Sequence, residues 1–203
     1  MAKIKARLKT LPTREDRRAA LVRAAFDQIA QRGFEGLRTR EVAAAAGVNI
    51  ATLHYYFPTK ETLISGALEH AMQRFRSTLE PHGSPSDQLR NHLRSVRRLA
   101  KEETDLGTVM GELALRSSRD PAIAAIFRQM NDGWHRTVRG LLKRSVKEGN
   151  LRAELDSDGA ASLIVATLTS MTLPELSSGS RSDQALRQLE KWLGISPTKV
   201  RSD

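Results

Sequence analysis

Cysteine is absent from the 203-residue chain, and glycine (13 residues), proline (7) and aromatic side chains (4%) are few. The lack of cysteine excludes disulfide frameworks, thiolate metal sites and cysteine nucleophiles. The low glycine and proline contents, together with 39% hydrophobic residues, argue against collagen-like and wholly disordered chains. A chain of this length can bury a hydrophobic core without covalent staples. We therefore expect a globular protein.

Long hydrophobic runs and common enzyme motifs are also missing. No apolar run approaches the roughly 18 residues that a membrane-spanning helix needs. The basic first ten residues are not followed by the apolar stretch of a signal peptide. The chain has no G-x-S-x-G, P-loop, G-x-G-x-x-G or H-E-x-x-H sequence, and its five histidines lack metal-ligand spacing. We expect a cytoplasmic protein without enzyme activity, metal or cofactor that does not act at a membrane.

Positive charge is abundant and unevenly distributed. The formal net charge is +10, from 33 basic and 23 acidic residues. Residues 1–60 contain 12 basic and 5 acidic side chains, a balance of +7, whereas the remainder has 21 and 18, a balance of +3. A basic N-terminal third favours a module that binds a polyanion, joined to a more neutral body. A basic surface that only serves solubility is the alternative, and composition does not separate the two.

Helical periodicity runs through the chain without strand-like alternation. The first helix is expected between an N-cap at Thr13 and a stop at Gly33. Two short helices should follow, one from Thr39 and one capped by Asn49 that ends before Pro58. Later helices are expected near residues 59–79, 89–99, 106–113, 121–149, 158–173 and 186–193. The sequence thus predicts an all-α protein with an N-terminal three-helix module and a C-terminal helical body.

The most informative stretch covers residues 37–62, LRTREVAAAAGVNIATLHYYFPTKET. Alanines at residues 43–46 allow two helices to approach closely, and Gly47 can adopt the left-handed conformation of a tight turn. The side chains expected in the small core beneath are Val42, Val48, Leu53 and Phe57. A short helix after such a turn, with polar side chains pointing outward, is typical of a helix-turn-helix. Its second helix enters a major groove about 12 Å wide.

The segment GVNIATLHYYF at residues 47–57, followed by Lys60, Glu61 and Leu63, resembles the DNA-binding domain of TetR-type (tetracycline-repressor-like) transcriptional regulators. The resemblance covers about residues 14–70. Asn49, Ala51 and His54 stand where serine, glycine and tyrosine are common, which affects the operator sequence rather than the fold. We expect His54 to pack against its own domain rather than to contact DNA.

The resemblance implies a sequence-specific repressor that binds a palindromic double-stranded DNA operator as a homodimer and is released by a small-molecule effector. The expected division is a basic flexible arm (1–12), a helix-turn-helix DNA-binding domain (13–58), a helical ligand-binding and dimerisation domain (59–195) and a tail (196–203). The arm either reaches a minor groove or adds only salt-dependent affinity. Two rival classes stay open: a helical small-molecule-binding protein or enzyme with an incidental basic surface, and a helical interaction protein without DNA function.

Ten residues are candidates for DNA contact: Arg38, Thr39, Arg40, Asn49, Ile50, Ala51, Thr52, Tyr55, Tyr56 and Lys60. The best candidates for reading base edges lie on the leading edge of the short second helix, namely Asn49, Ile50, Ala51 and Tyr55. Thr52 could contact a base or a phosphate. Plain core packing is the alternative role for the two tyrosines.

Phosphate contacts are expected at both ends of the motif. Tyr56 and Lys60 resemble phosphate contacts of the family. Thr39 would offer its hydroxyl and a helix N-terminus to a phosphate, or simply cap its helix. Arg38 and Arg40 add phosphate contacts or are solvated surface residues.

The C-terminal body supplies candidates for a ligand pocket and a dimer interface. Flexible methionines suit adaptable pockets, although core filling is the alternative. The pocket candidates are Met72, Phe75, Met110, Phe127, Met130, Trp134 and Met171, with His92, Asn131 and His135 as polar anchors or as satisfied core or surface residues. The apolar helix near residues 158–173 must be buried on several sides, by a second subunit or as an ordinary core helix. The interface candidates are Leu163, Leu168, Leu189 and Trp192.

Overall fold

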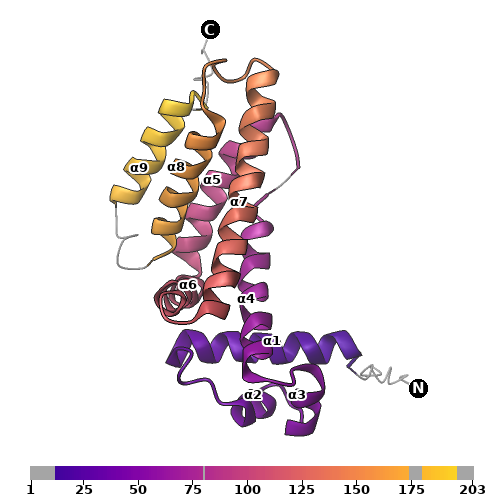
Figure 1. Ribbon diagram of the computed structural model, residues 1–203. Coiled ribbons are helices and arrows are strands. Elements are labelled where there is room, and N and C mark those ends of the chain that lie inside the picture. Colours follow the sequence, from indigo (N-terminus) through magenta and orange to yellow (C-terminus); the bar gives the residue numbers. More distant parts are fainter. Residues whose placement is uncertain (1–11, 80, 174–179, 196–203) are drawn as a thin grey trace, which may run out of the picture.

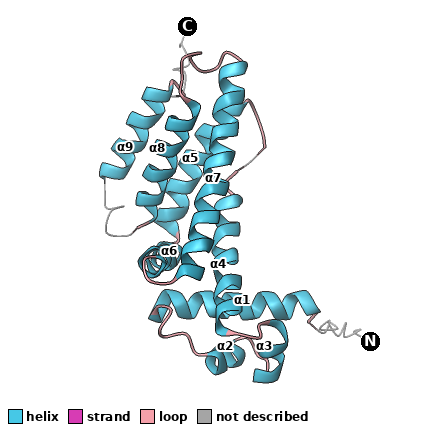
Figure 2. Cartoon of the chain, viewed as in Figure 1, coloured by secondary structure: helices cyan, strands magenta, loops and turns pink. Residues whose placement is uncertain are grey.

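The computed structural model describes residues 12–79, 81–173 and 180–195, and every regular element in these ranges is a helix. The helices are joined by turns and loops (Figure 2). The predicted all-α class is therefore confirmed, with a small N-terminal module, here called the head, and a helical body above it (Figure 1). Residues 1–11 of the expected arm (1–12) and the whole expected tail (196–203) lie outside the described residues.

The head consists of α1 (Arg14–Arg32), α2 (Thr39–Ala45) and α3 (Ile50–Tyr56). Figure 1 shows α1 lying across α2 and α3. As predicted, Thr13 caps α1 in a reciprocal pair with Asp16, and Gly33 ends it with a φ of 67°. Asn49 caps α3 by accepting a hydrogen bond from the Thr52 backbone N–H at 2.8 Å.

The start of α2 corrects one prediction. Thr39 is the first residue of the helix, but the N-cap position is occupied by Arg38, and no side chain caps it. The capping role proposed for the Thr39 hydroxyl is therefore wrong. A first-turn residue lies inside the helix rather than before it, so its side chain does not occupy the capping position.

Close packing joins the head to α4 (Lys60–Arg76). Leu21 and Leu53 are fully buried in the head, and Phe57 packs beside them at the end of α3. Gly66 of α4 lies where a Cβ would come within 2.9 Å of the Phe57 ring and 3.2 Å of Val22. The absence of a side chain at Gly66 thus lets α4 approach α1 and the end of α3.

The body is a bundle in which α4, α5 (Pro85–Glu102), α7 (Pro121–Lys147), α8 (Ser157–Thr172) and α9 (Ser180–Leu193) run roughly alongside one another. Figure 1 shows α6 (Thr104–Ser117) end-on, crossing the lower end of this bundle just above α1. Contacts between α7 and α8 are the most extensive of the fold. None of the described helices is both long and apolar enough to cross a membrane.

Ion pairs fasten α9 to α5. The Arg94 guanidinium donates to both carboxylate oxygens of Glu190 at 2.7 and 3.0 Å, and Glu190 is buried. Arg97 donates to Asp183 at 2.8 Å. Two-point contacts between a guanidinium and a buried carboxylate fix geometry as well as adding energy. The last described helix is therefore held in a defined position against the bundle.

Candidate nucleic-acid interface and cavity

The candidate DNA-contacting residues come from three short stretches of the head: the start of α2, the whole of α3 and the start of α4. The exposed members of the set are Arg38, Arg40, Asn49, Ala51 and Tyr55, and the half-buried members are Thr39, Ile50, Thr52, Tyr56 and Lys60. Tyr55 is 67% exposed, more than any other large hydrophobic residue described. Leu53 alone anchors α3 by complete burial, so the rest of this helix is accessible to a partner.

The two tyrosines form an aromatic pair at the end of α3. Their ring centroids are 5.2 Å apart in an edge-to-face arrangement. Neither hydroxyl has a hydrogen-bond partner among the described residues. Because a phenol can donate to a phosphate or a base, both groups are free for such a contact. The core-only alternative fits Tyr55 poorly, because its ring is mostly in solvent.

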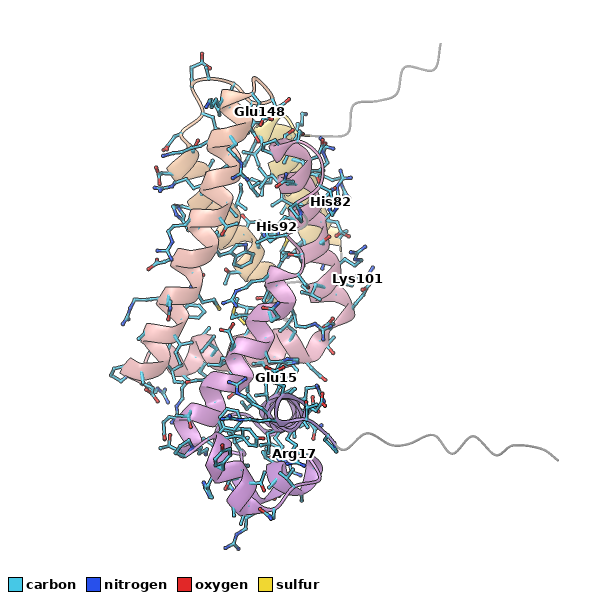
Figure 3. All side chains as sticks on the ribbon, turned by 90° about the vertical axis from the view of Figure 1, so that its right-hand side faces the viewer. Glu15, Arg17, His82, His92, Lys101 and Glu148 are labelled. Carbon is cyan, nitrogen blue, oxygen red and sulfur yellow. The ribbon has the colours of Figure 1, made fainter. Side chains whose placement is uncertain are left out.

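Two arginines of α1 add positive charge beside α3, which the sequence did not predict. The Arg14 guanidinium lies 5.6 Å from the centre of the Tyr55 ring, and that of Arg18 lies 5.3 Å from the Phe57 ring. Such cation–π contacts contribute about 0.5–1 kcal/mol at exposed sites. The signal that could have found them is the run of arginines in the first two turns of α1 (Figure 3 labels Arg17 there).

The remaining candidates differ in their exposure and in whether their side chains already have hydrogen-bond partners. Arg38 folds back, because its guanidinium donates to the backbone carbonyl of Glu35 at 2.5 Å. Arg40 forms no ion pair or hydrogen bond with the described residues and is exposed. His54 is also exposed, so the expectation that it packs against the head is wrong. It follows the buried Leu53 by one residue, and neighbours on a helix point in different directions.

The body contains a cavity of about 640 Å³ between α4 and α7. Four predicted pocket residues line it: Met72, Phe75, Met130 and Trp134. Further apolar lining comes from Leu68, Leu79 and Ile126, and polar lining from Ser65, Glu69, Arg76, Gln129, Arg136 and Thr137. The size lies within the range of small-molecule sites, which are mostly apolar with a few polar groups.

Three predicted pocket residues do not line this cavity. Met110 and Met171 are buried elsewhere between helices. Phe127 lines a separate hollow between α7 and α8, together with Asn131 and His135. The α7 residues on either side of Phe127, Ile126 and Met130, do line the cavity, because residues one apart on a helix face different directions.

A buried hydrogen-bond chain runs behind the cavity wall. The Trp134 indole N–H donates to Nε2 of His92 at 2.7 Å, so the imidazole proton sits on Nδ1, which lies 2.8 Å from the Thr78 hydroxyl. That hydroxyl donates to the carbonyl of Phe75 at 2.6 Å. His92 is 1% exposed, and burial lowers its pKa from 6.5 to about 4. The chain therefore joins the end of α4, α5 and α7 through a neutral histidine. Figure 3 labels His92 within the body.

The predicted interface residues divide into two groups. Leu163 and Trp192 are 48% and 61% exposed, and both border a hollow on the α8–α9 side that also includes Leu189. Leu189 is buried, and Leu168 is 0% exposed within the single chain. Placing Leu168 at a subunit surface is therefore wrong, because it faces the core of its own subunit.

Contacts between α6 and the α1–α2 turn form a second junction between head and body, which the sequence did not reveal. The Phe34 backbone N–H donates to the Glu112 carboxylate at 3.3 Å. Beside it, Arg116 of α6 forms an ion pair with Glu35. The head is thus connected to the body through continuous α4 and through these polar contacts.

Comparisons with known proteins cover both regions. The model described as bacterial regulatory proteins, tetR family, matches residues 21–67, and a tetracyclin repressor-like C-terminal domain model matches residues 79–187. The chain is 26% identical over 155 residues to the uncharacterized HTH-type transcriptional regulator YdeS of Bacillus subtilis, covering 75% of this chain and 76% of that protein.

Solved structures show the same fold. A putative TetR-family transcriptional regulator from Rhodococcus sp. has a TM-score of 0.78 at 24% identity, over 89% of this chain and 98% of that one. AibR, solved in complex with isovaleryl coenzyme A and operator DNA, has a TM-score of 0.64 at 17% identity, over 88% of this chain and 98% of that one.

Proposed function

Because the chain belongs to the TetR family of bacterial regulatory proteins, we propose that it is a sequence-specific transcriptional repressor whose α3 enters the major groove of an operator. The observation that carries the proposal is α3 itself: a capped seven-residue helix, anchored by one buried leucine, with Tyr55 extended into solvent. A regulator of this kind works on the chromosome, in the cytoplasm.

The roles at the DNA follow from the chemistry of the exposed groups. Asn49, Ala51 and Tyr55 would meet base edges, with Ile50 and Thr52 at the margin of that contact. Tyr56 and Lys60 would hold phosphates with a hydroxyl and an ammonium group. Arg40 and the α1 arginines would supply further phosphate contacts, which add affinity without sequence information.

The operator should be palindromic, because two copies of the chain would bind it as a twofold dimer. Exposed Leu163 and Trp192 support an interface along α8 and α9, since large apolar groups in solvent are covered when subunits associate. The two α3 helices of such a dimer must lie roughly 34–36 Å apart, or a multiple of that, to enter successive major grooves.

Release from the operator would start in the cavity. Met72 and Phe75 face it from α4, and the same helix packs against α1 in the head. A ligand that binds one arrangement of α4 more tightly shifts the protein toward that arrangement. The coupling expected for such systems is about 1–3 kcal/mol, or about 5–150-fold in DNA affinity.

Selection of DNA from a random pool by the purified chain tests the proposal. We expect enrichment of a palindrome whose half-sites are about one helical turn apart. The control is a Tyr55→Ala, Tyr56→Ala double variant, which should enrich no palindrome although it keeps the fold. If the unaltered chain enriches no sequence at low salt, the proposal fails. Catalytic turnover of a small molecule would then favour the rival class of helical enzyme or small-molecule-binding protein.

The link between cavity and head has its own test. Met72→Trp fills cavity space next to α4 without touching α3, so it should alter the response to ligand while leaving ligand-free DNA affinity within about twofold. DNA affinity is measured with and without ligand, and ligand affinity with and without DNA. Thermodynamic linkage requires equal factors in the two directions. If both ligands bind independently, the chain binds DNA constitutively.

A further inference from the structure

We infer that the effector is a largely apolar molecule carrying one negatively charged group, and that Arg136 is its cationic anchor. The inference rests on the proposed function, because it names the chemical class that the cavity between α4 and α7 would take. It follows from which charged groups around the cavity are paired and which one is not.

The aromatic part of the cavity wall offers an apolar surface, although the Trp134 ring carries a polar N–H. The rings of Phe75 and Trp134 lie 5.8 Å apart at 34°, forming a tilted aromatic face. The one polar atom of the Trp134 ring points away from a ligand, because its N–H is donated to His92. Met72 and Met130 complete a deformable apolar lining. Such a wall favours an alkyl chain or a fused ring over a polar molecule.

The charges at the cavity do not cancel. Glu69 and Arg76 both line it and form an ion pair with each other. Arg136 lines it as well, yet forms no ion pair or hydrogen bond with any residue that the structure describes. The nearby Thr137 hydroxyl donates to the carbonyl of Gly133 at 3.0 Å and is therefore occupied. One positive charge thus remains uncompensated among the cavity residues.

This uncompensated positive charge distinguishes between anionic, neutral and cationic ligands that are otherwise apolar. A guanidinium recognises carboxylate and phosphate oxygens through paired N–H groups, with stronger hydrogen bonds than those between neutral groups. A neutral ligand would gain at most a weaker hydrogen bond from Arg136, and a cationic ligand would be repelled by it. Arg136 is itself exposed where it lines the cavity, so the attraction is screened by water and is weaker than at a buried site.

Isothermal titration of the full chain with matched ten-carbon probes tests the inference. The probes are decanoate, decyl phosphate, decanol and decylamine; the ionic probes are kept below their critical micelle concentrations and decanol below its solubility limit. We expect at least one of the two anions to bind at least about tenfold more tightly than decanol, and decylamine to bind most weakly. Comparison of decanoate with decyl phosphate tells which anionic head the site prefers, and a preference for either supports the inference.

Three variants of α7 test whether Arg136 supplies the positive charge that attracts the anionic probes. Arg136→Gln should weaken anion binding about tenfold and leave decanol unchanged, whereas Arg136→Lys should retain most of the preference for anions. The matched control is Arg128→Gln, an equal loss of charge on the same helix; both arginines are exposed, but only Arg136 lines the cavity. This control should change anion binding by less than twofold, which separates a local anchor from general attraction to a chain of net charge +10.

Equal binding of both anions and decanol, or absence of binding by both anions, would overturn the inference. Equal losses in Arg136→Gln and Arg128→Gln would also overturn it, because they would indicate attraction to overall charge. If one of these results is found although the chain enriches a DNA palindrome, only the inference about the effector fails and the proposed function stands. If no DNA sequence is enriched, the proposed function fails, and with it the role of the anion as an effector.

Discussion

The candidate functional residues are arranged differently along the chain in the head and in the body. In the head, the candidate functional side chains are nearly contiguous in sequence and project from a short helix that a single buried leucine anchors. In the body, the cavity is assembled from α4 and α7, which are separated by two other helices along the chain. A surface that reads DNA can be specified by one local motif, whereas a cavity depends on how distant helices pack.

This contrast has a consequence for mutations. Changes on the exposed face of α3 should alter DNA binding with little effect on the free energy of unfolding. Changes in the body should act first on stability, because its key residues are buried and hydrogen-bonded. The following substitutions test the contrast in pairs.

The largest effect is expected from a charge placed inside the body. Leu168→Asp should lower the free energy of unfolding by at least about 4 kcal/mol, since a fully buried side chain is lost and a carboxylate is left without a partner. Circular dichroism during urea unfolding measures it. Leu163→Asp, at a half-exposed position of the same helix, should keep the helical spectrum and yield monomers by light scattering. A folded Leu163→Asp dimer would move the interface elsewhere.

The next effect concerns pH and His92. Its pKa of about 4 in the folded chain lies below the value of 6.5 for an exposed histidine. As pH falls from 6.5 to 4, the unfolded chain therefore binds a proton that the folded chain does not, and about 3 kcal/mol of stability is lost. His92→Gln should remove this part of the pH dependence, whereas His82→Gln, at an exposed position, should leave it intact. Identical pH profiles for wild type and His92→Gln would contradict the buried neutral imidazole.

In the head, Tyr55→Ala should reduce discrimination between operator variants by about 1–3 kcal/mol, because a base contact is lost. Lys60→Ala should instead weaken binding to every sequence and reduce the slope of log affinity against log salt by about one unit. Salt titrations on matched and mismatched duplexes distinguish the two effects. Equal behaviour of both variants would reject the assignment of base and phosphate roles.

The smallest effects come from two glycines within helices. Gly66→Ala should destabilise the chain by about 1 kcal/mol, because the added methyl would lie 2.9 Å from the Phe57 ring at the junction of head and body. Gly140→Ala, with no atom within 4 Å of the added carbon, should stabilise it by about 1 kcal/mol through helix propensity. Thermal unfolding measures both. If both substitutions stabilised the chain, α4 would not be held as closely against the Phe57 ring as described.

The parts that could be predicted from sequence depend on neighbours along the chain. Thr13, Gly33 and Asn49 mark helix ends through local hydrogen bonds and backbone conformation, and all three occupy the expected positions. The direction in which an interior side chain points could not be predicted in this way. The sequence of a helix with several apolar faces does not show which of these faces lines a cavity. Phe127 and Leu168 were misplaced for that reason.

Contacts between distant segments could not be predicted at all. The Arg116–Glu35 ion pair and the position of Arg14 over Tyr55 join residues that are unrelated in sequence pattern. The Trp134–His92–Thr78 chain likewise depends on three helices meeting. Such pairings arise from the packing of the whole fold. A local pattern, such as the arginine run at the start of α1, shows that charge is present but not which residue it contacts.

The most direct test of the central claim compares two duplexes at one salt concentration: the selected palindrome and a scrambled duplex of the same length and base composition. If α3 reads base edges, the chain should bind the palindrome at least about a thousandfold more tightly. The same ratio should fall by about 5–150-fold in Tyr55→Ala, in line with a loss of about 1–3 kcal/mol. Equal affinity of the unaltered chain for the two duplexes would contradict the account, because its positive charge alone would then explain binding.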